Sequence, residues 1–260
     1  MAIGAVSEER LPWNDSLNIS QPAMKHIWII TLFGLVSCHR PSLTELPQQG
    51  SAMQGRIIVS GFEPFDGRRR NASYQIAQLV AKAGTGRDIT VLEVPVHWGA
   101  PEKALASQKA RPWTLWLAFG EGTNIFQIET VANNRRINTE DNNDQKPSQA
   151  QMIKGAPEKL TSLFPAAALC DALVKRGLPV RVSVEAGNYL CEEMLFNLLH
   201  SQAEVPGPAP VVLFIHTPVL GAKVKMPDGS ERLMNEDLLG KFAAAILPAI
   251  EESLLNSVEP

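Results

Sequence analysis

The chain has 260 residues, of which 45% are apolar and 20% are charged, and its formal net charge is −3. This length suits one large domain or two small ones, and this composition is that of an ordinary globular protein. No long basic run and no basic patch interleaved with aromatic residues occurs, which argues against nucleic-acid binding.

The first 55 residues differ in character from the rest of the chain. An apolar run, Ile27–Val36, follows Met24-Lys25-His26 and leads into Leu35-Val36-Ser37-Cys38. At about ten residues the run is too short to span a bilayer as a helix, but it has the length of a signal-peptide core. The Leu-x-Ser-Cys at its end resembles the lipobox of bacterial lipoproteins, in which the cysteine is lipidated and becomes the new N-terminus.

We therefore expect residues 1–55 to be a leader, with a lipoprotein signal over about 24–38, lipidation at Cys38 and a flexible tether over His39–Gly55. Translation would then start at Met24, and the protein would be lipid-anchored in a bacterial cell envelope. A buried N-terminal strand or a disordered leader is the other interpretation of this segment.

From residue 56 onward, apolar strand patterns alternate with helical ones, which predicts a layered α/β domain. We expect strands over 56–60, 89–96, 114–119, 180–184 and 211–215, and helices over 73–82, 166–176, 192–200 and 235–255. The strand over 211–215 is apolar throughout and is therefore expected at the centre of the sheet. The polar, Asn-rich segment 129–147 predicts a long loop or an irregular hairpin.

Cys191 follows a predicted strand and the turn Glu185–Asn188, and it opens a predicted helix. A thiol there lies near the positive end of the helix dipole and near unpaired amide donors, which favour a thiolate and could hold an oxyanion. A small buried apolar cysteine is the plain alternative.

Of the three cysteines, Cys170 lies within an alanine-rich helical segment and Cys38 belongs to the leader. Because the cysteines are few and odd in number, we expect no disulfide framework. The sequence contains no CxxC pair, so no metal site is predicted either.

A cysteine nucleophile needs an imidazole partner, and the chain has five histidines. His26 and His39 flank the leader, and His200 points away from the cysteine on the same predicted helix. His97 follows a predicted strand and stays open as a candidate. His216 ends the most apolar strand, and the carboxyl end of a central strand is where α/β folds place catalytic groups, so His216 is the better candidate. Its alternative is a core histidine with satisfied hydrogen bonds.

A third group should orient the imidazole. Glu129 ends the apolar stretch Ile125–Ile128, which would tend to bury its carboxylate and create the need for a partner. Taken alone, a surface glutamate at the end of a strand fits this pattern as well. Glu185, Glu192 and Glu193, close to the cysteine in sequence, are alternatives.

A series of short motifs, in chain order, resembles those of the pyroglutamyl peptidase I family of cysteine peptidases. They are Gly61-Phe62-Glu63-Pro64-Phe65-Asp66-Gly67 with Asn71-Ala72-Ser73, Glu93-Val94-Pro95-Val96, Glu129-Thr130-Val131-Ala132, Glu140-Asp141-Asn142, Ala186-Gly187-Asn188-Tyr189-Leu190-Cys191, and Phe214-Ile215-His216-Thr217-Pro218. The resemblance runs from about Arg56 to Leu220. It implies a three-layer α/β/α sandwich with a twisted, mostly parallel central sheet, formed by one catalytic domain over residues 56–260.

The resemblance also implies the chemistry: hydrolysis of the amide bond after an N-terminal pyroglutamyl residue through a thioester acyl-enzyme. Cys191 would be the nucleophile, His216 its base, and Glu129 the residue that orients the histidine. The substrate would be a peptide or amide whose lactam suits aromatic walls and a few amide contacts. Phe62 and Phe65 match the family's walls, and Asn71 matches its lactam-contacting asparagine. No metal or organic cofactor is implied.

Two departures from the family pattern bear on the substrate. Phe119 stands where many bacterial members carry a glutamine that helps to bind the lactam. The spacing of the polar loop near Arg135 and Arg136 also differs from that of the family, so neither arginine receives a role. A thiol amidase of the same fold with another acyl specificity therefore stays open, as does a non-catalytic envelope lipoprotein that binds a peptide or another ligand. By family analogy a homo-oligomer is expected, and a cytoplasmic location is the alternative to the envelope.

Overall fold

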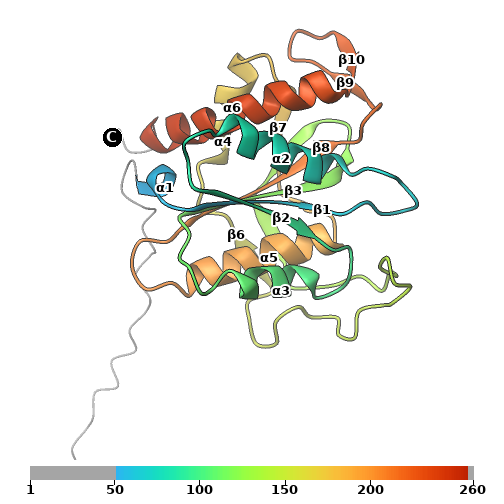
Figure 1. Cartoon of the computed structure of the whole chain (residues 1–260). Helices are drawn as coiled ribbons and strands as arrows, with labels where there is room; N and C mark the ends of the chain where they lie inside the picture. Colours follow the sequence, from blue (N-terminus) through green and yellow to red (C-terminus); the bar gives the residue numbers. More distant parts are fainter. Residues whose placement is uncertain (1–50, 257–260) are drawn as a thin grey trace, which may run out of the picture. The chain divides into compact units, whose positions relative to one another are not determined.

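The computed structural model describes residues 51–256. The predicted lipidation site Cys38, the signal over 24–38 and most of the predicted tether lie outside the described residues. The described part is built on a six-stranded sheet in the order β2-β1-β3-β8-β4-β7 (Figure 1). Its strands are β1 (Ile57–Phe62), β2 (Ile89–Val94), β3 (Leu115–Thr123), β4 (Phe126–Glu129), β7 (Val180–Ser183) and β8 (Val211–Pro218).

Six helices and two small strand pairs complete the described part. The helices are α1 (Ser51–Gln54), α2 (Ala72–Ala83), α3 (Ala100–Ser107), α4 (Ala166–Lys175), α5 (Leu190–Ala203) and α6 (Glu236–Asn256). The small antiparallel pairs are β5 (Val131–Asn133) with β6 (Lys159–Thr161), and β9 (Lys223–Lys225) with β10 (Glu231–Leu233). No helix among residues 51–256 is both long and apolar enough to cross a bilayer.

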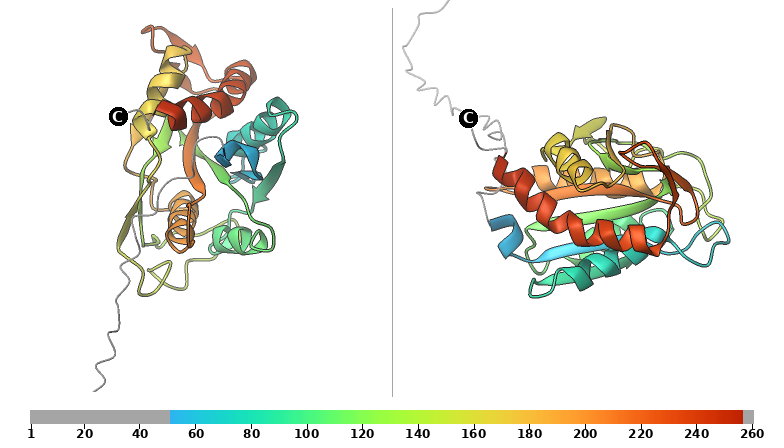
Figure 2. Two further views of the ribbon diagram at one scale, coloured as in Figure 1. Left: turned by 90° about the vertical axis from the view of Figure 1, so that its left-hand side faces the viewer. Right: turned by 90° about the horizontal axis from the view of Figure 1, so that it is seen from above.

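The sheet is mostly parallel and lies between two layers of helices. Within it β4 and β8 run antiparallel, and the other neighbouring strands run parallel. Helices α2, α4 and α6 cover one side, and α3 and α5 cover the other, as the end-on view in Figure 2 (left) also shows. We call these sides the α6 face and the α5 face. The predicted α/β fold with its mostly parallel sheet is confirmed.

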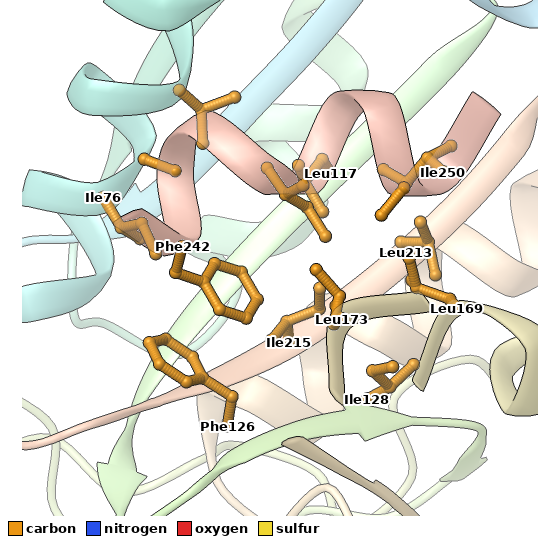
Figure 3. Packing of buried hydrophobic residues seen from close by; sticks show 14 of the residues in the cluster. Ile76, Leu117, Phe126, Ile128, Leu169, Leu173, Leu213, Ile215, Phe242 and Ile250 are labelled. Carbon is orange, nitrogen blue, oxygen red and sulfur yellow. The ribbon is translucent and has the colours of Figure 1, made fainter. Parts of the chain in front are cut away.

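Side chains along the central strands alternate between two cores. On β8, Leu213 and Ile215 belong to the core of the α6 face, whereas Phe214 belongs to the core of the α5 face. Figure 3 shows the α6-face core, in which Phe126 of β4 stacks on Phe242 of α6 with ring centroids 3.9 Å apart. Burial of this apolar surface on both sides of one sheet is the main stabilising contribution to the layered fold.

The same alternation determines which polar side chains can meet. Phe126 and Ile128 of β4 face α6, so Glu129 falls on the α5 face. His216 continues the α5-face series of β8 for the same reason. Because α5 carries Cys191 in its first turn, the folding pattern places all three candidate catalytic side chains on one side of the sheet.

Some elements were not predicted from the sequence patterns. Helix α3 has eight residues, which is too few for a clear helical periodicity. Strand β4 has four residues and was predicted only as an apolar stretch. The segment predicted as a loop or hairpin over 129–147 begins with the last residue of β4 and contains β5. Strand β5 pairs with the distant β6, Val131 opposite Thr161, and an irregular loop lies between the two strands.

Candidate active site

The polar side chains of the site stand in a row across the carboxyl end of the central strands. His216 on β8 lies opposite Gly120 on β3 and, on its other side, opposite Gln127 on β4. The imidazole of His216 and the carboxylate of Glu129 are both buried, and His216 Nδ1 lies 2.8 Å from Glu129 Oε1. With Nδ1–H donated to the carboxylate, Nε2 is the ring nitrogen available for proton transfer.

Cys191 is the second residue of α5 and lies within hydrogen-bonding reach of the His216 ring. The turn before the helix places two residues with positive φ in succession, Gly187 at 96° and Asn188 at 64°. Glycine adopts this conformation without a steric penalty, and asparagine tolerates it better than most residues. The sharp turn brings the first, unpaired amides of the helix and the thiol to the end of the sheet.

The nucleophile turn is held from two sides. Asn188 N donates to the Glu192 carboxylate at 2.9 Å, and Arg135 Nε donates to Asn188 Oδ1 at 3.0 Å. The same Glu192 carboxylate accepts hydrogen bonds from the backbone and side chain of Asn133 on β5. Arg135 and Glu192 therefore fix the backbone in front of Cys191, a role that the sequence patterns did not assign.

A close approach at Gly120 joins the cysteine to the histidine. A Cβ at this position would lie 2.7 Å from Cys191 Sγ, 2.9 Å from Phe214 Cζ and 3.0 Å from His216 Cδ2. Real Cβ atoms do not tolerate such contacts with atoms that cannot move away. Only glycine therefore allows the sulfur and the imidazole to pack together over this point of β3.

The electrostatics of the site favour a charged imidazole. Burial would by itself lower the pKa of His216, but the Cys191 thiolate and the Glu129 carboxylate overcome it and raise the pKa to about 10. The His216 imidazole is therefore protonated at neutral pH, beside the Cys191 sulfur. An imidazolium next to a cysteine can donate a proton to a leaving group.

A cavity of about 580 Å³ opens beside the sulfur and the imidazole. Its walls include Phe62, Phe65 and Asn71, the three residues predicted to contact substrate, together with Cys191 and His216. The structure thus brings every predicted site residue of residues 51–256 to one place, with Glu129 behind the histidine. Within that same part of the chain, no three His, Cys, Asp or Glu side chains gather in a way that could hold a metal ion.

Most of the hydrogen-bonding groups of Asn71 are already engaged within the protein. Its Oδ1 accepts from Ser73 N at 2.9 Å and from Ser73 Oγ at 2.7 Å, which caps the N-terminus of α2. Its Nδ2 donates to Glu63 O at 2.9 Å. Because a side-chain amide has two N–H bonds, one donor of Asn71 remains for a group in the cavity.

A charged pair in the cavity wall was not predicted. Arg68 forms an ion pair with the buried carboxylate of Glu121, and its guanidinium carbon lies 4.0 Å from the ring centroid of Phe65. Glu121 also accepts from Ala72 N at 2.8 Å, at the start of α2. Burial raises the pKa of Glu121, and the hydrogen bond from Ala72 and the Arg68 charge lower it in part. The pair fixes the loop that carries Phe65 against β3.

The fourth motif of the sequence is attached to the first and the fifth. Asn142 Nδ2 donates to Pro64 O at 3.0 Å and to Glu63 Oε1 at 3.2 Å. Tyr189, directly before the nucleophile helix, donates its hydroxyl to Glu140 O at 3.1 Å. These contacts hold the loop after β5 against the rim of the cavity, so motifs far apart in the sequence form one structure.

The alternative candidates do not reach the cysteine–histidine pair. His97 Nδ1 lies 3.0 Å from Asn143 Nδ2 and is not part of the cavity wall. Glu185 is exposed. Glu193 is buried but is engaged with Arg136, whose Nη2 lies 2.8 Å from its Oε1 and whose Nε donates to its Oε2 at 3.2 Å. Arg136 is thus a structural partner of helix α5, which carries Cys191.

The expectation that Phe119 alters the ligand pocket is corrected by its position. Phe119 is fully buried in the core of the α6 face, on the opposite side of β3 from Cys191 and His216. Successive residues of a strand point to opposite faces, so Gly120 and not Phe119 faces the cavity side. Phe119 therefore contributes to packing and does not line the pocket.

Comparison with known proteins gives concordant matches over this part of the chain. A family model described as pyroglutamyl peptidase matches residues 55–252. The pyrrolidone-carboxylate peptidase of Klebsiella pneumoniae (strain 342) is 30% identical over 206 residues, which cover 76% of this chain and 94% of that protein. That of Thermococcus kodakarensis is 33% identical over 168 residues, which cover 63% of this chain and 81% of that protein.

Solved structures match as well. The crystal structure of pyroglutamyl peptidase I from Bacillus amyloliquefaciens has a TM-score of 0.62 at 21% identity, covering 76% of this chain and 96% of that chain. A variant of pyrrolidone carboxyl peptidase from Pyrococcus furiosus has a TM-score of 0.62 at 24% identity, covering 78% of this chain and 100% of that chain. At these identities the likeness shows the fold.

Proposed function

Because the chain belongs to the pyroglutamyl peptidase family, we propose that it is a cysteine peptidase that hydrolyses the amide bond after an N-terminal pyroglutamyl residue. One observation carries the assignment of the chemistry to this site. His216 lies between the Glu129 carboxylate and the Cys191 thiol, beside a cavity with aromatic walls. That arrangement is what acyl transfer to a thiol requires.

The reaction begins with attack of the Cys191 thiolate on the carbonyl carbon of the pyroglutamyl residue. The negative charge that develops on the carbonyl oxygen is stabilised by unpaired backbone N–H groups in the first turn of α5. The His216 imidazolium donates its proton to the leaving amine, and the C–N bond breaks to leave a thioester. Glu129 keeps the ring oriented with Nε2 toward the reacting atoms.

The second half of the reaction uses the same groups in the reverse sense. Neutral His216 takes a proton from a water molecule, and the resulting hydroxide attacks the thioester carbonyl. Collapse of the tetrahedral intermediate releases free pyroglutamate and returns the thiolate with the imidazolium beside it. No step needs an electron carrier or a further reactant besides water.

The cavity supports a small uncharged acyl group. Phe62 and Phe65 offer aromatic surface to a five-membered ring, and the remaining N–H of Asn71 offers a donor to the lactam oxygen. The cation nearest this wall, Arg68, is neutralised by Glu121 and so offers no free counter-charge to an acidic acyl group. This supports a lactam over an N-terminal glutamate.

The direct test is release of a fluorescent amine from a pyroglutamyl amide, with the matching prolyl amide as control. The prolyl compound has the same ring without the lactam oxygen. We expect cleavage of the pyroglutamyl amide only, and loss of that cleavage in Cys191→Ala and His216→Ala. Glu129→Gln should reduce kcat by roughly 100- to 10,000-fold, because the imidazole loses its orienting carboxylate. Exposed Glu185→Gln is the control for this change.

Two other outcomes of this test would replace the proposal. Labelling of Cys191 by iodoacetamide without cleavage of the pyroglutamyl amide would favour a thiol amidase with another acyl specificity. A Cys191 that neither cleaves nor reacts with iodoacetamide would favour a ligand-binding protein without turnover.

The location and assembly of the protein are separate proposals. We propose that Cys38 is lipidated and anchors the protein in a bacterial envelope, on the evidence of the apolar run and Leu-x-Ser-Cys motif before it. Labelling with radioactive palmitate should mark the wild type and not Cys38→Ser; equal labelling of both, or of neither, contradicts the anchor. A homo-oligomer is tested by the mass of the purified protein in solution.

A further inference from the structure

Contact with His216 alone does not account for how the buried carboxylate of Glu129 is held in place. It is 1% exposed, and only its Oε1 faces His216. Its Oε2 is buried and has no hydrogen-bond partner among the described residues. A buried carboxylate held by His216 alone would be costly and free to rotate, and a further donor on the same face of the sheet would restrain it.

Gln127 is the side chain whose position allows it to restrain the Glu129 carboxylate. It lies two residues before Glu129 on β4 and therefore points to the same face. In the ladder between strands it stands opposite His216 on β8 and beside Arg181 on β7. Gln127 is almost fully buried, whereas Arg181 lies at the exposed edge of the sheet. The row across the strands thus runs from surface to site: Arg181, Gln127, His216.

The neighbours of Gln127 allow its amide only one orientation. Arg181 on one side can only donate hydrogen bonds, and the Glu129 carboxylate on the other can only accept them. With its oxygen toward the arginine, Gln127 accepts from Arg181 Nε at 2.8 Å and also from Nη2. Its nitrogen then donates to Glu129 Oε1 at 3.2 Å. Amide orientation is assigned from such networks, and donors on one side with an acceptor on the other select this orientation.

We propose that Gln127 and Arg181 are positioning residues of the catalytic site, in which Arg181 orients the Gln127 amide and Gln127 holds and partly neutralises the Glu129 carboxylate that orients His216. The inference rests on the proposed function of the site. Neither residue is part of the cavity wall. Their effect reaches the reaction through the charge and the orientation of Glu129.

The proposal predicts how the titration of His216 responds. The charged groups that face its ring are Cys191 from α5 and Glu129 from β4, and Glu192 of α5 lies close enough to Glu129 to interact with it. Removing the Gln127 donor leaves the full carboxylate charge to act on the imidazolium. The pKa of His216 should therefore rise in Gln127→Met, and rise further in Gln127→Glu, which adds a second carboxylate opposite the ring.

The experiment follows His216 by NMR in the substrate-free full-length protein, with labelled histidine and His216→Asn to assign the signal. We expect the midpoint to move to higher pH in the order wild type, Gln127→Met, Gln127→Glu, and upward also in Arg181→Met. In the amide-hydrolysis assay, Gln127→Met should lower kcat by about 10-fold, the scale of one hydrogen bond to a charged group, with KM unchanged. Arg181→Met, an exposed change, should lower kcat by about three-fold.

Two matched controls separate positioning from general destabilisation. Gln202 is a buried glutamine that donates to Pro210 O at 2.6 Å away from the site, so Gln202→Met should lower stability without moving the His216 titration. Arg232→Met removes an exposed arginine on β10 and should change neither quantity. An unchanged or lowered His216 midpoint in Gln127→Met and Arg181→Met overturns the proposal. Because the titration needs no substrate, that result is distinct from a failure to cleave pyroglutamyl amides.

Discussion

Gly120 lies directly beneath the sulfur of Cys191, so that a Cβ on this glycine would lie 2.7 Å from Sγ. The same atom would lie 3.0 Å from Cδ2 of His216, which stands opposite Gly120 in the neighbouring strand. The absence of a side chain at Gly120 on β3 therefore allows the Cys191 sulfur from α5 and the His216 imidazole from β8 to come together. Three elements thus meet here: α5 carries the sulfur, β8 carries the imidazole, and β3 leaves room for both at Gly120.

The first prediction concerns this contact. Gly120→Ala should push the sulfur and the imidazole apart and reduce kcat/KM for a pyroglutamyl amide by roughly 100-fold or more, since displacements of about 1 Å have effects of that size. Gly240→Ala is the matched control, because a Cβ there meets no atom within 4 Å and alanine favours the helix by about 0.5–1 kcal/mol. Equal activity of Gly120→Ala and wild type would show that the pair does not pack over β3 in this way.

A second prediction follows from the charge state of the histidine. Among the influences that raise the pKa of His216 to about 10 against its burial, the Cys191 thiolate is the largest. Cys191→Ala should therefore move the NMR midpoint of His216 to clearly lower pH, while Glu129 retains part of the effect. A midpoint unaffected by Cys191→Ala would mean that sulfur and imidazole do not interact.

The same shift links His216 to stability, with a defined sign. Its pKa is raised above the ordinary value of 6.5, so its contribution to the free energy of unfolding is fully present below pH 6.5 and is lost as pH rises toward about 10. Urea unfolding across this range should show a smaller decline for His216→Asn than for wild type. A steeper decline in the variant would contradict the raised pKa.

A third prediction concerns the support of the nucleophile helix. Arg136 and Glu193 form a buried pair, with side chains 10% and 0% exposed. Arg136→Met leaves a buried carboxylate without its cation and should lower the free energy of unfolding by about 3–5 kcal/mol. Arg70→Met, which removes the exposed pair with Glu236, should cost less than about 1 kcal/mol. Similar losses in the two variants would argue against burial of the Arg136 pair.

A fourth prediction addresses the position at which this chain departs from the family pattern. Phe119→Gln introduces the residue that the resemblance to the family implies for this position, but Phe119 lies in the α6-face core and not in the cavity wall. The change should lower the free energy of unfolding by about 3 kcal/mol or more, through lost packing and an unpaired buried amide, without lowering KM. A clear decrease in KM would place this side chain in the pocket after all.

The convergence of the candidate catalytic residues could be predicted in part because two of them have a local signature. Cys191 opens a helix after a turn, and His216 ends an apolar strand, so the chemical meaning of both positions can be inferred from the sequence. The pattern at Glu129 was weaker evidence on its own, since a glutamate at a strand end is usually exposed. Its interaction with His216 depends on the antiparallel pairing of β4 with β8, which joins residues far apart in the chain.

The supporting charges could not be predicted for a related reason. Arg68 with Glu121, Arg136 with Glu193 and Arg181 with Gln127 each join segments more than fifty residues apart. In the sequence these arginines stand in polar segments or at a strand edge, where a solvated side chain is the ordinary expectation. Only the folded arrangement shows that each has a buried partner.

The measurement closest to the central claim is the mass of the acyl-enzyme. The protein is mixed with excess pyroglutamyl amide, quenched in acid during turnover and analysed by intact-mass spectrometry and peptide mapping. We predict a mass increase of one pyroglutamyl group, carried by Cys191 through an acid-stable thioester, and none in Cys191→Ala or with the prolyl amide. Full hydrolysis by Cys191→Ala, or an adduct on any other residue, would contradict the account.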